Sequence, residues 1–418
     1  MSASSQARDV ARSVVTEPDL AQQVAAHYRL RPGELLRIAF HAGPGDAAGS
    51  FDYWTEGEHD RRVPVIAYST QFFALAQSIG ADAYIITEPP HQPQRRRDGF
   101  HFIPTARDRS RRGIGWHVEE SAYARRVLAH LRRIRPHVVV MGTDLPPWFY
   151  TALPRSTALI LTMHNTFWPM GRRATGAKAR LKQALRGLGL RRASAAVCTS
   201  PECARQLATL TGGQKELFVE MPQIPAGRLP ALHPRDAARA LLYLGRIEAN
   251  KGVFDLLTAF SNLASHRPDI TLTLAGTGSA APAVEEAIRT APHRERIRYS
   301  GQLSAEGVIA ALQRADLLVC PTRSSFNEGL ALVVIEAAAM GVPSVVSSVI
   351  PAQDHVPDGC AVYPADDTAA LERSLAAVID SSDAYQALAE GTASIRAQVL
   401  DRSRSWGSQL AHAMLIAR

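Results

Sequence analysis

Several features that would place this 418-residue chain in a specialised class are missing from its sequence. The four cysteines, at positions 198, 203, 320 and 360, have spacings that fit neither a disulfide framework nor a zinc site. The first 20 residues lack the apolar stretch of a signal peptide, so we expect a cytoplasmic protein. The longest apolar region, residues 329–350, carries Glu336 and then Gly341-Val342-Pro343, which predicts a buried helix and a strand instead of a membrane span.

What the sequence does contain indicates a globular protein with two domains. Its apolar fraction is 46% and its charged fraction 21%, and the chain is too long for one ordinary α/β core. The net charge of +8 is uneven, because residues 1–222 hold 30 basic and 19 acidic side chains and residues 223–418 hold 17 and 20. Either the first half meets an anionic partner, such as nucleic acid, a membrane or a substrate, or its surface is simply solvated and rich in arginine.

Strands alternate with helices in two series, which predicts parallel βαβ units. A proline-rich segment at residues 221–234 separates the series and reads as a linker. We therefore predict two doubly wound α/β domains. The first series has apolar strands at residues 37–41, 83–87, 137–142, 158–162 and 195–199, and the second at 241–244, 270–275, 297–300, 316–320 and 344–347.

Two basic residues follow the first strand of the second series. Arg246 and Lys251 lie on either side of a turn at the carboxyl end of that strand. Open α/β sheets bind their ligands at this end, and both side chains suit an anion. Basic loop residues are also commonly just solvated, so the pattern alone leaves both interpretations open.

Two carboxylates eight positions apart, Glu328 and Glu336, flank a helix that we expect to begin near Leu330. The start of a helix offers free N–H groups and a positive dipole end, which favour phosphate. Eight helical residues span roughly 12 Å, so the glutamates could reach a sugar and a ribose on opposite sides of a diphosphate. Equally, one glutamate could cap the helix and the other could lie on its side without binding a ligand. Glu336 lies among apolar residues and needs partners if it is buried, and ribose hydroxyls would serve.

The second half of the sequence resembles the donor-binding domain of the family 4 retaining glycosyltransferases (group 1), which have the GT-B fold. The matching segments, in order, are GRIEANKG, LAGTGS, IRYSG, DLLVCPTRSS, NEGLALVVIEAAAMGVPSVVS, DHVPDGCAVYPADD and the Trp406 segment SRSWGSQLAHAML. The resemblance implies two Rossmann-like domains facing a central cleft, and hexosyl transfer from a nucleoside diphosphate sugar without another cofactor. It implies the following division: a polar extension at residues 1–32, an acceptor-binding domain at 33–222, a linker at 223–238, a donor-binding domain at 239–395 and a helix at 396–418 that returns to the first domain.

The resemblance also assigns roles to residues. Arg246 and Lys251 would hold the donor diphosphate, Glu328 the donor sugar and Glu336 the ribose. Residues 329–331 (Gly329, Leu330 and Ala331) would offer backbone N–H groups, although Ala331 stands where the family commonly has glycine.

The first domain resembles the family more loosely. Leu161-Thr162-Met163-His164-Asn165 falls where the family often has a strand followed by His-Asp, and only His164 is carried over, as a residue that reaches the sugar. Residues 43–49 resemble the first glycine-rich loop, whose Gly45 and Gly49 would touch the phosphates despite their different spacing.

Parts of the sequence also fit other functions. Gly276-Thr277-Gly278-Ser279-Ala280-Ala281 fits a dinucleotide fingerprint, but the next strand lacks the acidic residue that a dehydrogenase needs. A sugar-nucleotide epimerase or hydrolase of the same fold remains an alternative, as does a non-catalytic Arg-rich binding protein. The residue set above argues against a nucleic-acid partner. The sequence has no D-x-D triplet, so we expect a metal-independent reaction.

Two features of the first half bear on the acceptor. Trp54, Trp116, Trp148 and Trp168 could stack an acceptor sugar or belong to the core. Residues 172–192 carry eight basic residues and no acidic one, with Leu181, Leu185 and Leu188 on one helical face. This face either packs on the sheet of the first domain or rests on anionic lipid headgroups at the inner membrane surface.

Overall fold

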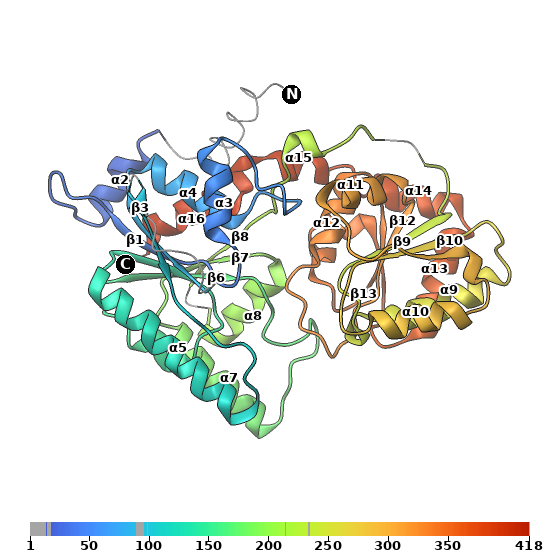
Figure 1. The fold of residues 1–418 in the computed structure, drawn as a ribbon, viewed down its shortest axis with the longest axis horizontal. Coiled ribbons are helices and arrows are strands. Elements are labelled where there is room, and N and C mark those ends of the chain that lie inside the picture. Colours follow the sequence, from blue (N-terminus) through green and yellow to red (C-terminus); the bar gives the residue numbers. More distant parts are fainter. Residues whose placement is uncertain are drawn as a thin grey trace.

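The computed structural model describes residues 18–88, 99–213, 215–232 and 235–417, together with residues 14, 96 and 97. Residues 1–13 and 15–17 of the predicted extension lie outside this part. The described chain forms two α/β domains side by side, with the predominantly blue to green domain at the left of Figure 1 and the predominantly yellow to red domain at the right. The predicted fold class is confirmed.

The first domain is built on an eight-stranded sheet with the order β3-β4-β2-β1-β5-β6-β7-β8, in which only β3 runs antiparallel. Its strands are β1 (Arg37–His41), β2 (Asp82–Thr87), β3 (Arg96–Arg97), β4 (Phe100–Pro104), β5 (Val138–Met141), β6 (Ala158–Met163), β7 (Ala195–Cys198) and β8 (Glu216–Val219). Its helices are α2 (Leu20–His27), α3 (Ala47–Thr55), α4 (Tyr68–Ser78), α5 (Gly113–Ile134), α6 (Pro147–Thr151), α7 (Ala177–Leu190) and α8 (Pro201–Thr211).

The second domain has a six-stranded, wholly parallel sheet with the order β11-β10-β9-β12-β13-β14. Its strands are β9 (Ala240–Leu244), β10 (Thr271–Ala275), β11 (Ile297–Tyr299), β12 (Leu317–Cys320), β13 (Ser344–Ser347) and β14 (Cys360–Tyr363). Its helices are α9 (Val253–Ala264), α10 (Ala281–Thr290), α11 (Ala305–Arg314), α12 (Leu332–Ala339), α13 (Thr368–Ile379), α14 (Ser382–Glu390) and α15 (Ile395–Leu400). The short β14, which the apolar pattern did not predict, extends this sheet at one edge.

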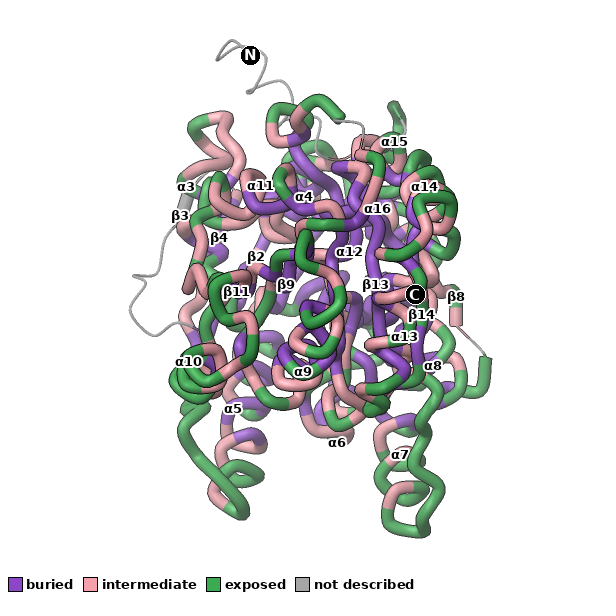
Figure 2. Tube along the Cα trace, turned by 90° about the vertical axis from the view of Figure 1, so that its right-hand side faces the viewer, coloured by how far each residue is buried: buried purple, intermediate pink, exposed green. Residues whose placement is uncertain are grey.

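Both sheets are buried on both faces, as parallel sheets require. In β1, Ile38 and Phe40 pack into one core and Ala39 into another on the opposite face. In β9, Leu242 packs into one core and Leu241 into another on the opposite face. Figure 2 shows this buried interior around the strands, while the protruding ends of α5 and α7 at the bottom are largely exposed. Hydrophobic runs without alternation therefore marked these strands correctly.

The end of the chain crosses back to the first domain. Helix α16 (Trp406–Ile416) packs against α4, β7 and β8. Trp406 is fully buried, and the backbone N–H of Gly407 donates to Gln71 Oε1 over 2.9 Å. A side chain at Gly407 would meet Gln71, so glycine permits this close approach.

Part of the segment predicted as a polar extension is folded instead. Leu20 and Val24 of α2 are buried in the core of the first domain. The hydroxyl of Tyr28 donates to the carbonyl of Met414 over 2.7 Å. Two apolar residues one helical turn apart are a weak signal by themselves, and α16 supplies the surface that buries them. No helix in the described ranges has the length and apolarity to span a membrane.

Candidate functional site

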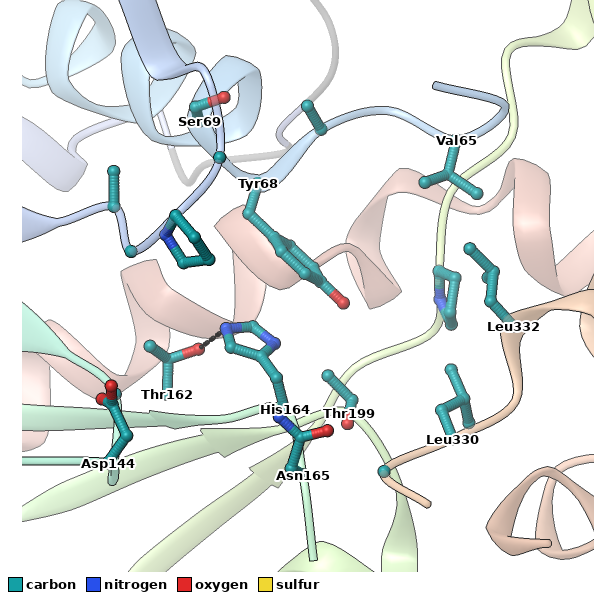
Figure 3. Close-up of a pocket in the computed structure, with 18 of the residues that line it drawn as sticks. Val65, Tyr68, Ser69, Asp144, Thr162, His164, Asn165, Thr199, Leu330 and Leu332 are labelled. Atoms are coloured by element: carbon teal, nitrogen blue, oxygen red, sulfur yellow. Dashed lines mark hydrogen bonds between the residues drawn. The ribbon is translucent and has the colours of Figure 1, made fainter. Parts of the chain in front are cut away.

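A cavity of about 1130 Å³ lies between the domains, at the carboxyl ends of β1, β5 and β6. Figure 3 shows part of it, with Tyr68, Asp144 and His164 from the first domain and Leu330 and Leu332 from the second. Its lining includes residues 40–47 after β1, 142–144 after β5, 164–167 after β6 and 327–332 of the second domain. Ligands of open α/β sheets bind at this end of the strands, so both domains face a common site.

The glycine-rich segment after β1 forms one wall, but only in part as predicted. Gly45 lines the cavity. Gly49 instead lies inside α3, and its N–H donates to Oδ1 of the helix-capping Asp46 over 2.9 Å. Asp46 is a strong N-cap residue, so the helix begins at Ala47 and removes Gly49 from the predicted loop.

Arg246, Lys251 and Glu328 come together around a residue that the sequence did not single out. Lys251 Nζ donates to Glu328 Oε2, and the two side chains are each only 13% exposed. The Phe326 ring lies 4.0 Å from Lys251 Nζ and 5.0 Å from the Arg246 guanidinium carbon, measured to its centroid. An aromatic face attracts cations, so Phe326 holds both basic groups at one place. No spacing rule links position 326 to positions 246 and 251.

The start of α12 faces the same region. Gly329, Leu330, Ala331 and Leu332 line the cavity, and the helix begins at Leu332, two residues later than expected. Ala331, where glycine is common in the family, has a φ of +66°, which costs an alanine about 1–2 kcal/mol. This left-handed residue leads into the helix, whose first N–H groups lack intrahelical acceptors.

The loop before α12 touches the first domain directly. Thr166 Oγ1 donates to the Glu328 carbonyl over 3.0 Å, and Ser200 Oγ donates to the Gly329 carbonyl over 2.8 Å. A Cβ at Gly329 would lie 1.8 Å from the carbonyl oxygen of His164. Glycine is therefore required here by the approach of the two domains.

His164 is fixed by contacts from three elements. Its ring lies against that of Tyr68 with centroids 4.6 Å apart and the planes tilted by 32°, and its Nε2 lies 2.7 Å from Thr162 Oγ1 (Figure 3). Trp406 Nε1 donates to the same Thr162 oxygen over 3.1 Å. A Thr162 hydroxyl that donates to Nε2 leaves that nitrogen unprotonated and places the proton of the neutral ring on Nδ1, and we propose this arrangement.

The other ring nitrogen of His164, Nδ1, is buried and has no hydrogen-bond partner among the described residues. Burial lowers the His164 pKa to about 4, so the ring is neutral near pH 7. With its proton on Nδ1, the neutral ring has an unused hydrogen-bond donor at that nitrogen and is a poor proton acceptor.

Glu336 has the surroundings predicted for a binding carboxylate. It is 5% exposed on α12, and its Oε1 lacks a partner among the described residues. Burial raises its pKa to about 7, with Arg228 acting in the opposite direction. Glu336, Arg246 and Lys251 lie outside the lining of the cavity, whereas His164, Glu328, Gly329, Leu330, Ala331 and Gly45 belong to it.

The four tryptophans that could stack an acceptor sugar or belong to the core lie away from this cavity. None of Trp54, Trp116, Trp148 and Trp168 lines it. Trp168 is buried in the core, and Trp116 and Trp148 are exposed. The aromatic lining residues are Phe40, Tyr68 and Phe167, of which Tyr68 also donates to the buried Glu220 over 2.7 Å. Position relative to a strand end could not distinguish these rings from the tryptophans.

Replacing Gly329 with Ala is expected to hold the domains apart, because the added Cβ would collide with the His164 carbonyl. Small-angle X-ray scattering should then give a larger radius of gyration than the unchanged protein. Gly45→Ala is a matched control, since nothing lies within 4 Å of the position of its Cβ. Identical scattering from the Gly329→Ala variant and the unchanged protein would contradict this role.

Replacing Thr162 with Val is expected to release the His164 ring from one tautomer, since valine keeps the shape and removes the hydroxyl. Nitrogen-15 NMR of the ring should find the proton on Nδ1 in the unchanged protein and on both nitrogens in the variant. Thr151→Val, which removes a hydroxyl bonded to the Trp148 carbonyl, serves as control. A wild-type ring protonated on Nε2 would rule out the proposed hydrogen-bond direction.

Comparison with known proteins follows the same division into two domains. Residues 74–219 match the family described as "Glycosyltransferase Family 4", and residues 238–381 match the family described as "Glycosyl transferases group 1". Glycogen synthase from Mycobacterium tuberculosis (strain ATCC 25618 / H37Rv) is 32% identical over 239 residues, which cover 54% of this chain and 56% of that protein. The match therefore spans about half the length of this curated relative.

Solved structures resemble almost the whole chain in fold. Sucrose-phosphate synthase from Thermosynechococcus elongatus has a TM-score of 0.65 at 17% identity, covering 91% of this chain and 97% of that one. The trehalose-6-phosphate protein from E. coli, solved bound with UDP-2-fluoro glucose, has a TM-score of 0.66 at 10% identity, covering 91% and 100%. Together with the matches of both domains, this likeness confirms the resemblance that the motifs carried. The chain belongs to the group 1, family 4 glycosyltransferases and has the GT-B fold.

Proposed function

We propose that this protein transfers a sugar from a nucleoside diphosphate sugar to an acceptor hydroxyl in the interdomain cavity. The observation that carries the proposal is the meeting of Lys251, Glu328 and the start of α12 where the second domain faces His164. The E. coli protein of the same fold, bound with UDP-2-fluoro glucose, supports a nucleotide sugar as donor.

The chemistry asks for stabilisation of a leaving group. The bond between the donor sugar carbon and the diphosphate oxygen breaks, and a bond from the acceptor oxygen to that carbon forms. The acceptor proton passes to the departing diphosphate, on the same face of the sugar, so that configuration is retained. Negative charge grows on the diphosphate, and Arg246, Lys251 and the helix N-terminus are preorganised positive groups for it.

The two glutamates and the histidine bind different parts of the donor in this proposal. Glu328 accepts hydrogen bonds from donor-sugar hydroxyls, and Glu336 accepts them from the ribose. His164 donates from Nδ1 to the sugar. No metal is needed, because the cationic groups serve the diphosphate and the sequence has no D-x-D triplet.

A further part of the proposal concerns the membrane. The alternative in which the leucine face of α7 packs on the sheet is wrong, since Leu181, Leu185 and Leu188 are 62%, 52% and 59% exposed. The helix packs through its glycines instead. A Cβ at Gly187 would lie 2.3 Å from the Leu210 carbonyl oxygen, and one at Gly189 would lie 2.5 Å from that of Pro147. The leucines are thereby turned outward.

A second exposed apolar stretch occurs at the start of α5. Ile114, Trp116 and Val118 are exposed, and α5 and α7 project toward the bottom in both Figure 1 and Figure 2. Lys178 and Arg180 on α7 are exposed beside its leucines. Apolar side chains flanked by cations complement an anionic lipid surface, so we propose peripheral contact with the cytoplasmic face of the inner membrane.

Arg246→Ala and Lys251→Ala should each lower kcat by roughly 100-fold or more, because each removes a group that stabilises leaving-group charge. Donor turnover with and without acceptor, in the presence of EDTA, is the measurement. Arg289→Ala, which removes an exposed arginine paired with Glu286 on α10, is the control. Wild-type turnover in either variant would refute the role of that residue. Full inhibition by EDTA would refute a metal-independent reaction, and equal donor loss without acceptor would refute transfer to an acceptor.

Nucleoside diphosphate binding should strengthen as pH rises through about 7, the pKa of Glu336, because the carboxylate accepts ribose hydroxyls better than the acid does. Glu336→Gln should bind more weakly at pH 8 and lose most of this pH dependence, as measured by calorimetry. Since the raised pKa costs folding stability that grows from pH 4.5 to about 7 and is fully present above pH 7, the variant should also melt at a higher temperature at pH 8. Glu328→Gln should change donor-sugar selectivity more than affinity for the bare nucleotide. Identical effects of the two changes would contradict this division.

Vesicles containing anionic lipid should bind the protein at low salt, neutral vesicles should bind it weakly, and high salt should release it. Lys178→Gln with Arg180→Gln should weaken binding by about fivefold per residue, and Leu181→Ser with Leu185→Ser should weaken it without changing nucleotide affinity. Arg172 is left unchanged because it pairs with Asp366 across the domains over 3.3 Å. Leu232→Ser, at an exposed leucine of the linker, is the control. A protein that ignores anionic vesicles, or buries these leucines in a dimer, would overturn the membrane contact.

A further inference from the structure

The charged residues that line the cavity differ in whether they have a partner of opposite charge within the protein. Four carboxylates belong to the lining, and each has a cation beside it within the protein. The pairs are Asp46 with Arg62 at 2.6 Å, Asp60 with Arg62 at 2.7 Å, Asp144 with Arg107 at 3.0 Å, and Glu328 with Lys251. The lining residue Arg109 is likewise paired, with Glu88 over 2.6 Å.

Two lining cations remain without such a partner. Lys182 and Arg186 lie one turn apart on α7, so their side chains share one face of the helix. In the described part of the chain neither forms an ion pair. The Arg186 guanidinium carbon instead lies 4.8 Å from the centroid of the Phe167 ring, and Arg186 is half-buried.

Holding a half-buried cation without an anion has a cost. Desolvation disfavours its charged form, and burial indeed lowers the Arg186 pKa. Contact with an aromatic ring compensates for part of this cost. An anionic ligand would compensate for the rest, and a guanidinium beside an ammonium suits the oxygens of a phosphate ester.

These residues are separate from the groups assigned to the donor. The proposed diphosphate site lies on the second domain, at Arg246 and Lys251, whereas α7 and Phe167 belong to the first. We propose that Lys182 and Arg186 form a subsite for a phosphate group of the acceptor. This inference rests on the proposed transferase function, whose acceptor it narrows to a phosphorylated molecule.

The neighbouring face of α7 bears on the source of that phosphate. Leu181 and Leu185 immediately precede Lys182 and Arg186, so an apolar face and the cavity-lining cations lie next to each other on the helix. A lipid on the leucine face would bring its phosphate to the cations, and a soluble sugar phosphate would reach them from the cavity. Both sources share the same recognition chemistry.

The test compares acceptors that differ by a phosphate. Glucose 6-phosphate and glucose form the soluble arm, and vesicles of phosphatidylglycerol and of diglucosyl diacylglycerol in neutral lipid form the membrane arm. Binding is measured by calorimetry with UDP present, and transfer by donor consumption. The unchanged protein should bind the phosphorylated member of at least one pair more tightly. Lys182→Gln with Arg186→Gln should weaken that binding by at least about tenfold, since hydrogen bonds to charged groups are the stronger ones.

Controls separate this subsite from general charge and from the donor site. Arg180→Gln removes an exposed cation of the same helix outside the lining and should leave glucose 6-phosphate affinity unchanged. Arg186→Lys, which keeps the charge and loses the planar fork, should fall between the unchanged protein and Arg186→Gln. UDP affinity should stay the same in all variants.

The outcomes are decisive in both directions. A loss confined to the soluble pair identifies a sugar phosphate, and a loss confined to vesicles identifies a lipid headgroup; both support the subsite. Equal binding of phosphorylated and neutral acceptors, or a loss of UDP affinity in the double variant, overturns it. Absence of sugar transfer with normal UDP and phosphate binding would refute the proposed function and leave the subsite standing.

Discussion

The site depends on one contact, the approach of the loop before α12 to the carboxyl ends of β6 and β7. Thr166 and Ser200 hydrogen-bond to the carbonyls of Glu328 and Gly329, and the missing side chain of Gly329 lets the loop reach the His164 backbone. Because of this contact, residues more than 150 positions apart enclose one cavity.

A second long-range contact orients the ring of His164. Helix α16 is the last element of the chain, yet Trp406 reaches Thr162 in the first domain and through it orients His164. The indole of Trp406 can only donate, so it uses the Thr162 oxygen as an acceptor and leaves the Thr162 proton for His164 Nε2 in the arrangement that we propose. The returning helix thus stabilises the first domain and sets the chemical character of a residue in the cavity.

The two domains differ in how their charged groups are arranged around the cavity. The second domain gathers cations over Phe326 and pairs Lys251 with Glu328, where the donor is proposed to bind. The first domain pairs its cavity-lining carboxylates with Arg62 and Arg107, whereas Lys182 and Arg186 of α7 have no ion-pair partner in the described part of the chain. An excess of basic residues in the first half therefore has two uses: many arginines serve internal ion pairs, and a few remain for ligands or surfaces.

The sequence by itself determined the doubly wound domains, most strand positions and the residue types near the second-domain turn, because burial of parallel strands and the ends of helices leave local patterns. It could not determine which distant residues meet. Three features depend on contacts between segments that are far apart in the sequence. They are the contact of Phe326 with two cations, the hydrogen bond between Trp406 and Thr162, and the position of Lys182 and Arg186 in the cavity lining. Nor could it decide the outward leucine face of α7, since Gly187 and Gly189 allow another face to pack closely. Periodicity reports that a helix has an apolar face, and only the tertiary structure decides whether the protein or something else covers that face.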